Sequence, residues 1–538
     1  MNDDADSTRR IGGARRLPPV PPAPSPESGE PGRGARRERA GSRSLGSVLG
    51  LTALNAVVPG TAFLATGRRR TGALVLAAAV LLVAAGAWAA TAGRRSAARL
   101  AVDSGALTWL IAGLVVLALA WIVVIVTGYR SLRPRGAGRP GHALGALLVA
   151  ALVAAVAYPA YRVGTIAVAQ RSLLDGVFAS DRESATVPET PDPFGDKERV
   201  NVLLLGGDGG EGRDGVRTDT VIVASIETAT GDTTLFSLPR NLEELPFPAG
   251  SPLAEVYPDG FDAGSESESL LNAVYRNGPA AHPDILGPTD DPGADFLKLG
   301  VGEALGLPID YHVLVNLDGF SRLVDALGGI TVNVNYYVPI TGEPTRGILP
   351  DGYIAPGPDQ RMDGQTALHF ARGRFGLTDY DRMARQRCTI DAIIDAADPM
   401  TLLEQYQELA ATTQDIVSTD IPRSVLGDFV DLGFLVKDAE VRSVVFDTSL
   451  IDPAYPDYDR MRQIVQESLA AAPAPPAPAP APGTNASGAE PSAEVPNGSP
   501  PAPVEGAAPA SDVADACAYD SAQAQAALDA GEPPTRQG

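Results

Sequence analysis

Four apolar segments occupy much of the first third of the chain and constrain its fold more than any other feature. They span residues 46–66, 71–93, 105–128 and 142–161. The last three reach the ~20 residues that a helix needs to cross the hydrocarbon core of a bilayer. The first contains Asn55 and the helix-breaking pair Pro59-Gly60. The sequence therefore predicts an all-α transmembrane region over residues 45–168.

Arginines between these segments indicate how the region crosses the membrane. The tail before the first segment, the run 68–70 and the run 130–139 are the strongest candidates for cytoplasmic loops, because basic loops remain inside. All three face the cytoplasm if the first segment is a re-entrant hairpin. Three spans then remain, and the chain after Arg162 emerges outside. Four spans would leave the rest of the chain cytoplasmic. We predict three, although the arginines at 94–99 then face outward.

Charge divides the chain at the end of the membrane region. Residues 1–171 hold 21 arginines, no lysine and 7 acidic residues, whereas the remainder holds 22 basic and 58 acidic residues. This asymmetry predicts a multi-pass anchor in the cell membrane that carries a large acidic head. Such a head repels nucleic acid, so any anion that it binds must meet a local group of cations. The two cysteines and four histidines show no metal-binding spacing, so no structural metal site is expected.

Shifts in composition divide the chain into six parts. Residues 1–44 are rich in Pro, Gly and Arg and are predicted to be a disordered cytoplasmic tail before the transmembrane region. A polar connector at 169–197 leads to an extracytoplasmic domain at 198–468, in which strand and helix signals alternate. A Pro/Ala-rich linker at 469–510 and a C-terminal tail at 511–538 follow. The alternating signals predict the α/β class, a layered domain with a mixed β-sheet.

One loop of this domain matches a nucleotide-binding motif. Residues 207–212 read G-D-G-G-E-G and satisfy G-x-G-x-x-G directly after an apolar strand signal. A dinucleotide-binding fold needs a helix that begins at this loop, so that its N-terminus faces the pyrophosphate. Here the loop leads into a second strand signal, TDTVIVASIE, and no G-K-[ST] follows. The β-loop-β pattern therefore argues against both kinds of nucleotide-binding loop.

Arginines concentrate elsewhere in the acidic head. Arg217 and Asp219 lie two residues apart at a strand start and point to one face, although alone they would be an ordinary surface ion pair. Arg240 follows the strand signal TTLFSLP, and five arginines lie within residues 372–387. A solvated helix face would explain that run, but five guanidinium groups repel one another unless an anion or carboxylates intervene. Because the guanidinium fork fits phosphate oxygens, these residues predict a phosphate-binding site.

Two helices flank these residues in the prediction. The segment SESESLLNAVYRNG is predicted to be one helix, with Ser265 and Glu268 as a capping box and Gly278 as its stop. The segment TDYDRMARQRCTIDAIIDAA is predicted to be another, with Ile390 and Ile394 in its apolar stripe. Arg372 and Arg374, two residues apart before this second helix, should point the same way if the chain there is extended.

The motifs and their order resemble those of the LytR-CpsA-Psr family. The segments that carry the resemblance are NVLLLGGDGG, RTDTVIVASI, TTLFSLPRN, LLNAVYRNG, VNLDGFSRLVDALGGITVNV and MDGQTALHFARGRFGLTDYDRMARQRC. They cover about residues 198–450, although the glycine-rich loop and the multispan anchor depart from the family's usual forms. The resemblance implies an α/β/α layered domain outside the membrane. It also implies transfer of a glycopolymer from a polyprenyl-pyrophosphate carrier to peptidoglycan, with a phosphodiester link.

The resemblance further implies a site. Asp208 and Asp219 match carboxylates near Mg²⁺, for which Mn²⁺ is an alternative. The residues that match the pyrophosphate site are Arg217, Arg240, Arg372, Arg374, Arg382, Arg385 and Gln386. The catalytic set is expected to be Asp208, Arg217, Asp219, Arg240, Arg374 and Asp381. The general base remains open among Asp219, Asp379 and Asp381, with Asp219 favoured.

The two cysteines, Cys388 and Cys517, allow two interpretations. An extracytoplasmic head would permit a disulfide between them, which would fasten the C-terminal tail to the helix that carries Arg385. Two free thiols are the alternative.

Two other functions remain compatible with these residues. The first is a polyprenyl-phosphate-binding regulatory membrane protein without turnover, which would need the cations but not both loop carboxylates. The second is a lipid pyrophosphatase, which differs only in that water is the acceptor. The sequence leaves open the polymer, the acceptor and the oligomeric state.

Overall fold

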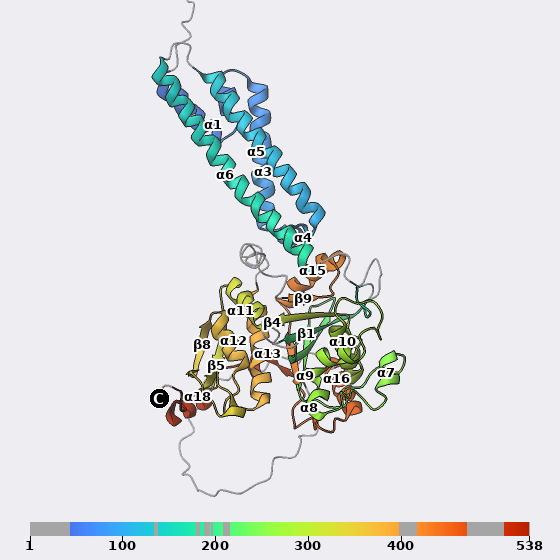
Figure 1. Ribbon diagram of the computed structural model, residues 1–538. Coiled ribbons are helices and arrows are strands. Elements are labelled where there is room, and N and C mark those ends of the chain that lie inside the picture. The colour runs from blue at the N-terminus through green and yellow to red at the C-terminus, as the bar shows by residue number, and fades with distance from the viewer. Residues whose placement is uncertain are drawn as a thin grey trace, which may run out of the picture.

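The computed structural model places a helical bundle on an α/β head (Figure 1). It describes residues 44–133, 138–178, 183–187, 194, 197–207, 216–397, 417–470 and 510–536. Within this part of the chain, three helical segments are long and apolar enough to cross a membrane. They are α3 (Arg69–Ala90), α5 (Ser104–Leu132) and the portion Arg139–Val168 of α6 (Arg139–Val177).

The first apolar segment folds as a helical hairpin. Its two arms are α1 (Leu45–Val57) and the short α2 (Thr61–Ala65). Between them, the buried Asn55 accepts hydrogen bonds from the amides of Gly60 and Ala62, both at 3.1 Å, and donates to the Val124 carbonyl of α5 at 3.1 Å. These bonds satisfy backbone groups that a helix break exposes in an apolar environment. The hydrogen bonds of Asn55 therefore stabilise the predicted helix break at Pro59-Gly60.

The head is built on a seven-stranded mixed sheet with the order β11-β10-β3-β2-β1-β4-β9. The strands are β1 (Arg199–Gly207), β2 (Thr218–Glu227), β3 (Thr233–Leu238), β4 (Tyr311–Asn316), β9 (Val417–Thr419), β10 (Val441–Val445) and β11 (Ser511–Asp512). Strands β1, β2 and β3 are antiparallel neighbours, whereas β4 runs parallel to β1 and β10 runs parallel to β3.

Helices cover both faces of this sheet. On one face the main core joins sheet residues such as Val223 and Phe236 to α9 (Leu271–Ala281), α10 (Pro292–Leu305) and α16 (Tyr458–Ala470). The residue before Val223 in β2, Ile222, points to the other face. There it lies in a cluster with Ile390 and Ile394 of α13 (Asp379–Ala396). This alternation along β2 is the period of two that a strand imposes. The three layers confirm the predicted α/β/α fold.

A smaller unit adjoins α13. It contains a second core cluster and two two-stranded sheets, β5 with β8 and β6 with β7. Its elements are α11 (Leu317–Ala326), β5 (Ile330–Val334), β6 (Val338–Ile340), β7 (Gly352–Ile354), β8 (Gly357–Met362) and α12 (Gly364–Arg372). The other α-helices in the described part of the head are α7 (Pro252–Val256), α8 (Glu266–Ser269), α15 (Leu426–Val436), α17 (Val513–Ala516) and α18 (Ser521–Ala530).

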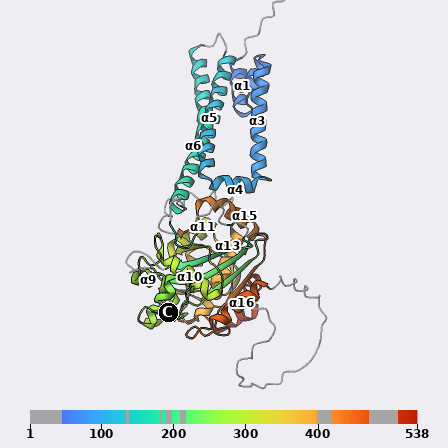
Figure 2. The same ribbon diagram turned by 90° about the vertical axis from the view of Figure 1, so that its right-hand side faces the viewer.

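Part of the contact between the head and the bundle is made by two short helices, α4 (Arg94–Val102) and α15, which lie one above the other in Figure 2. Arg99 of α4 pairs with Asp431 of α15, and its Nη2 lies 3.9 Å from Oδ1 of Asp428. The guanidinium of Arg95 lies 5.6 Å from the ring centroid of Phe434. Two of the three arginines at 94–99 are thus paired with the head, which gives a physical reason for basic residues between the second and third apolar segments.

The C-terminal tail packs back onto the head. Its strand β11 extends the sheet beside β10, and a disulfide joins Cys517 to Cys388 of α13, with Cα atoms 5.6 Å apart. The side-chain amide of Asn333 also donates to the Cys517 carbonyl at 3.1 Å. Of the two interpretations of the cysteines, the structure shows the bonded one.

The helix predicted over SESESLLNAVYRNG is wrong as a single element. The chain forms α8, leaves the helical conformation at Leu270, where ψ is 153°, and begins again as α9. Ser265 makes no side-chain cap, and Gly278 lies inside α9. The Glu268 carboxylate binds arginines instead of closing a capping box. The second predicted helix is present as α13.

Candidate active site

Strand pairing places the first two residues of the site side by side. Val221 of β2 pairs with Leu238 of β3, so the start of β2 lies next to the corner that follows β3. From this corner Nη1 of Arg240 donates to Oδ1 of Asp219 at 2.8 Å. The side-chain amide of Asn272, in the first turn of α9, donates to the same oxygen at 3.2 Å. Three elements thus converge on the Asp219 carboxylate.

Asp379, the first residue of α13, contacts Arg240 and also brings two further arginines next to the Asp219–Arg240 pair. Its Oδ2 lies 2.9 Å from Nη2 of Arg382, one helical turn later. Its Oδ1 lies 3.5 Å from Nε of Arg240 and 3.6 Å from Nη1 of Arg374. We call Asp219, Arg240, Arg374, Asp379 and Arg382 the arginine cluster. It holds three guanidinium groups against two carboxylates, so it keeps one excess positive charge in an acidic head.

Burial and charge act in opposite directions on the cluster. Burial alone would raise the pKa of Asp219, but the hydrogen bond and charge of Arg240, with smaller contributions from Asn272 and Arg382, hold it below its ordinary value. Burial lowers the pKa of Arg382 below its ordinary value, against the opposing effect of Asp379. Asp219 is therefore ionised at neutral pH. In this arrangement it is a weak base and is better suited to holding cations.

The side chains differ in how far they reach solvent. The Arg382 side chain is 5 % exposed, whereas those of Arg240 and Arg374 are 31 % and 36 % exposed. Arg382 is the buried member of the cluster. The other two arginines, Arg240 and Arg374, are accessible to a ligand from solvent. Accessible guanidinium forks beside a fixed positive charge suit the binding of phosphate oxygens.

Two residues of the predicted pyrophosphate set, Arg385 and Gln386, hold together the elements that carry the cluster. Arg385 donates to the Phe370 carbonyl at 2.7 Å, to the Tyr336 hydroxyl at 2.9 Å and to the Gly373 carbonyl, and it is 4 % exposed. Gln386 donates from Nε2 to Oγ1 of Thr220 at 2.8 Å, which ties α13 to β2. Both residues position the elements that carry the cluster, and the structure does not bring Arg385 among the cluster residues.

Asp381, predicted to be catalytic, caps α13 instead. Its Oδ2 accepts hydrogen bonds from the Thr378 amide at 2.8 Å and the Thr378 hydroxyl at 2.7 Å. The Asp381 amide donates to the same hydroxyl at 3.1 Å, which completes a capping box. A carboxylate held in this way faces the helix end and not the arginines. Asp379, two residues earlier and also a predicted candidate for the general base, is the aspartate that contacts the arginines.

Arg217 and Arg372 lie outside the cluster. Arg217 Nη2 binds Glu268 Oε1 at 2.6 Å, and Arg372, the last residue of α12, is exposed. Asp208 lies outside the described residues, so its role as a metal ligand stays a prediction. Within the described ranges no group of three His, Cys, Asp or Glu side chains could hold a metal ion.

Sequence reasoning missed Asn272 and Glu268 as site residues. Asn272 carries no charge and has no spacing that marks it, although it stands in one of the segments that carry the family resemblance. Glu268 was assigned to a capping box. An acidic residue with two arginines nearby in space gives no local sequence signal, because Arg217 is 51 residues away.

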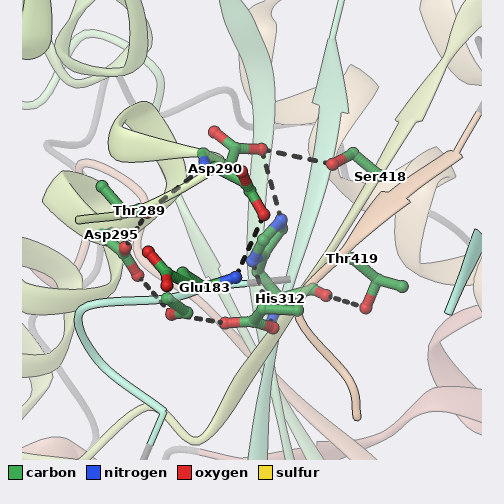
Figure 3. A pocket seen from close by; sticks show the side chains of 10 residues that line it. Glu183, Thr289, Asp290, Asp295, His312, Ser418 and Thr419 are labelled. Atoms are coloured by element: carbon green, nitrogen blue, oxygen red, sulfur yellow. Dashed lines mark hydrogen bonds and ion pairs between the residues drawn. The ribbon is translucent and has the colours of Figure 1, made fainter. Parts of the chain in front are cut away.

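A second polar network lies at the other end of the strands (Figure 3). His312 of β4 pairs with Leu203 of β1, four residues from Gly207, which pairs with Thr218. The residues that line its cavity of about 370 Å³ include Glu183, Thr289, Asp290, Asp295, His312 and Ser418. At about 3.3 Å per strand residue, this cavity lies roughly 13 Å from the cluster along β1.

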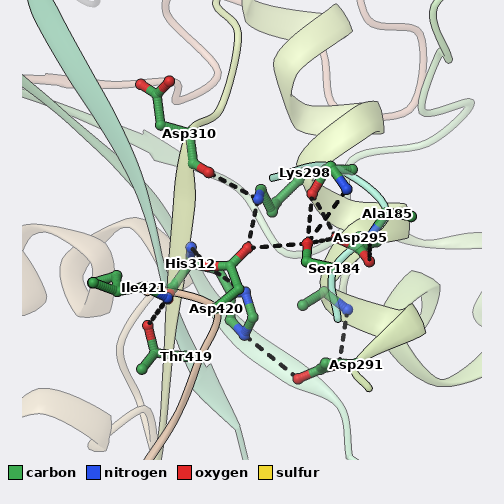
Figure 4. A network of polar contacts seen from close by, with 12 residues as sticks. Ser184, Ala185, Asp291, Asp295, Lys298, Asp310, His312, Thr419, Asp420 and Ile421 are labelled. Carbon is green, nitrogen blue, oxygen red and sulfur yellow. Dashed lines mark hydrogen bonds and ion pairs between the residues drawn. The ribbon is translucent and has the colours of Figure 1, made fainter. Parts of the chain in front are cut away.

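This network fastens the connector to the head (Figure 4). Asp295 accepts hydrogen bonds from the Ser184 hydroxyl at 2.8 Å and the Ala185 amide at 3.0 Å. Asp420 binds Nζ of the buried Lys298 at 2.5 Å and lies 3.2 Å from Nδ1 of His312. These contacts join chain segments more than 100 residues apart, so we assign the network a structural role.

Stability is expected to fall at alkaline pH because of His312. Burial would lower its pKa, but Asp291, at 3.5 Å, and Asp420 raise it from 6.5 to about 9. Because the folded-state pKa is the higher one, the charged ring stabilises the fold below about pH 6.5, and this contribution is lost as pH rises through 9. We expect a loss of roughly 3 kcal/mol.

The measurement is thermal unfolding between pH 6 and pH 10, for the wild type and for His312→Gln. The difference in stability between the two proteins should shrink over that range, because the variant lacks the titrating ring. A constant difference would contradict the assignment of a charged His312.

Comparison with known protein families tests the resemblance to the LytR-CpsA-Psr family. A family model described as the LytR_cpsA_psr family matches residues 177–459. The chain belongs to the LytR-CpsA-Psr family. The match includes β1 to β10 and all residues of the arginine cluster.

Curated relatives match the same part of the chain. One is the polyisoprenyl-teichoic acid–peptidoglycan teichoic acid transferase TagU of Enterococcus faecalis, 31 % identical over 230 residues, which are 42 % of this chain and 62 % of that protein. Another is biofilm regulatory protein A of Streptococcus mutans, 27 % identical over 236 residues, 43 % of this chain and 52 % of that one. The chain thus spans less than two thirds of the length of these relatives.

Two solved structures match about half of the chain at low TM-scores. The Bacillus subtilis TagV structure is 24 % identical and has a TM-score of 0.34, and the match covers 52 % of this chain and 100 % of that one. TagT bound to LIIa-WTA is 20 % identical, with a TM-score of 0.34 and coverage of 54 % and 96 %.

Proposed function

We propose that this LytR-CpsA-Psr protein transfers a glycopolymer from a polyprenyl-pyrophosphate carrier to peptidoglycan and forms a phosphodiester. The observation that carries the proposal is the convergence of Arg240, Arg374 and Arg382 on one carboxylate, Asp379, beside Asp219. Family membership and the transferase names of several relatives support it. We assign the diphosphate of the donor to this cluster.

The reaction needs positioning and charge stabilisation more than covalent help from the protein. The accessible forks of Arg240 and Arg374 hold the diphosphate oxygens, and Arg382 supplies a fixed charge beneath them. A hydroxyl of the acceptor sugar attacks the phosphorus nearest the polymer. The new O–P bond forms as the bond to the bridging oxygen breaks, and polyprenyl phosphate leaves with the bonding electrons. The hydroxyl proton passes to a carboxylate, for which Asp219 and Asp379 are the two predicted candidates that lie in the arginine cluster.

A divalent cation fits this site only if carboxylates of the protein and phosphate oxygens of the donor coordinate it together. Asp219 is ionised, and the buried Oδ1 of Asp379 accepts no hydrogen bond within the described residues. Mg²⁺ in phosphoryl-transfer sites is bound by one or two carboxylates together with substrate phosphates. We propose that Asp219, with Asp208, would hold Mg²⁺ or Mn²⁺, which would neutralise charge on the departing phosphate.

The test is a transfer assay with the full-length protein, a lipid-linked donor and peptidoglycan, with and without Mg²⁺. Covalent polymer on the peptidoglycan, lost after chelation and restored by Mg²⁺, is the expected result. Polymer phosphate released without attachment would indicate a lipid pyrophosphatase. Donor binding with neither product would indicate the regulatory alternative. Either outcome would replace the transferase assignment.

We propose that the protein is a multi-pass membrane protein whose head lies outside the cytoplasm. The three span-length helices and the hairpin of α1 and α2 support an odd number of crossings before the head. A reporter that is active only in the cytoplasm should stay inactive when fused after Arg171. The same reporter placed before Leu45 should be active. Activity after Arg171 would place the head inside.

A further inference from the structure

A second group of polar side chains lies beside the arginine cluster, and the proposed function leaves most of it unexplained. Glu268 of α8 binds Arg217 Nη2 through Oε1 at 2.6 Å and binds Nη2 of Arg276 through Oε2. The side-chain amide of Asn277 donates to the same Oε2 at 2.8 Å. One carboxylate therefore bridges two guanidinium groups that come from the entry of β2 and from α9. We call Arg217, Glu268 and Arg276 the rim triad.

Two short-range relations place the rim triad next to the proposed diphosphate position. Arg276 follows Asn272 by four residues on α9, so the two side chains lie on one helix face. Asn272 itself donates to Asp219 of the arginine cluster. Arg217 precedes Asp219 by two residues where the chain enters β2. Arg217 is thus two residues from Asp219 along the chain, and Arg276 lies one helical turn after Asn272, which binds the Asp219 carboxylate.

The rim triad is open to solvent and carries excess positive charge. The side chains of Arg217, Glu268 and Arg276 are 29 %, 35 % and 30 % exposed. Two guanidinium groups face one carboxylate in a part of the chain where acidic residues outnumber basic ones 58 to 22. A guanidinium fork accepts a carboxylate or a phosphate in the same geometry. An incoming anion can therefore replace Glu268 without leaving either arginine unpaired.

We propose that Arg217 and Arg276 form a second anion subsite, which binds a negatively charged group on the first sugars of the glycopolymer. Glu268 occupies the subsite until the donor arrives. This inference rests on the proposed function, because the arginine cluster fixes where the polymer begins. It adds a substrate class, namely a polymer that carries a carboxylate or phosphate close to its diphosphate. A neutral polymer leaves Glu268 in place.

The test compares three short-chain polyprenyl-diphosphate donors with the full-length protein in detergent. One donor carries a neutral disaccharide, one carries a hexuronic acid as its second sugar, and one carries a sugar phosphate there. Arg276→Ala should raise the KM for the better charged donor about tenfold more than the KM for the neutral donor, with little change in kcat. Glu268→Gln should lower the KM for that charged donor several-fold. The charged donor with the larger response identifies the group.

The matched control is Arg346→Ala, which removes another surface arginine with an acidic partner, Glu343, at 3.2 Å. It should shift the KM values of all three donors by less than twofold. Equal effects of Arg276→Ala on neutral and charged donors, or an unchanged KM in Glu268→Gln, would overturn the subsite.

If the wild type transfers none of the donors, the proposed function fails. Calorimetric measurement of the binding of the same donors then tests the anion subsite independently of transfer. Arg276→Ala must weaken binding of the charged donor about tenfold more than binding of the neutral one. A smaller difference would reject the subsite.

Discussion

Arg240→Ala is expected to lower kcat/KM for glycopolymer transfer by about 10³-fold, because loss of one donor to a developing oxyanion typically has an effect of that size. Arg240 contacts both carboxylates of the cluster, Asp219 at 2.8 Å and Asp379 at 3.5 Å. In the proposed complex its fork holds diphosphate oxygens whose charge grows as the bridging bond breaks. The measurement is the rate at which labelled polymer becomes attached to peptidoglycan.

The fold should survive this substitution. The Arg240 side chain is 31 % exposed, and ion pairs at such positions contribute little to stability, under about 1 kcal/mol. The melting temperature of Arg240→Ala should therefore stay within a few degrees of the wild type. Arg240→Lys keeps the charge but loses the planar fork, so it should recover only part of the rate.

The control for Arg240→Ala is Arg346→Ala, at an exposed ion pair in the smaller unit of the head. This variant should transfer polymer at the wild-type rate. If Arg240→Ala transfers polymer within threefold of the wild type, the diphosphate is not held by the arginine cluster, and the proposed mechanism fails with it.

Local spacing predicted part of this site and misplaced the rest. Arg217 and Asp219 lie near each other as the strand period requires, but Glu268, distant in sequence, pairs with Arg217. The chain before α13 was expected to be extended, yet α12 continues to Arg372, and Arg374 is the one paired with Asp379. Where a helix ends depends on packing as well as on local preference, so the spacing could not decide between these arginines.

The sequence contains a pattern that indicates the capping role of Asp381. Thr378 and Asp381 form a T-x-x-D pattern at the start of a predicted helix, which is a variant of the capping box. That pattern commits Asp381 to its own helix end and leaves Asp379 as the acid that can face the arginines. The sequence analysis listed Asp381 in the catalytic set and left the general base open among Asp219, Asp379 and Asp381.

The sheet order could not be predicted from the sequence. The strands β1, β2 and β3 follow from their apolar pattern and from the turn between the last two. The pairing of Val202 with Tyr311, by contrast, joins segments more than 100 residues apart, and Ser511 reaches the edge strand β10 only after a long linker. Such contacts depend on the packing of whole layers and on the disulfide, and neither leaves a local pattern.

Loss of the disulfide between Cys388 and Cys517 is expected to destabilise the head by about 4 kcal/mol, because a cross-link over so long a loop removes much entropy from the unfolded chain. The bonded cysteines are 129 residues apart in sequence. Cys388 lies on α13, which also carries Asp379 and Arg382 of the arginine cluster. Thermal unfolding of Cys388→Ser/Cys517→Ser should show a melting temperature lower by roughly 10 °C.

Each single substitution, Cys388→Ser and Cys517→Ser, should match the double variant once its remaining thiol is alkylated, because either change opens the same loop. Reduction of the wild type should lower its melting temperature to the same value, whereas reduction of the double variant should change nothing. A wild type that melts at one temperature with and without reductant would mean that the tail is held by β11 and its hydrogen bonds to Asn333 and Asn335. In that case the covalent link would not stabilise α13, and the tail would anchor the head through packing alone.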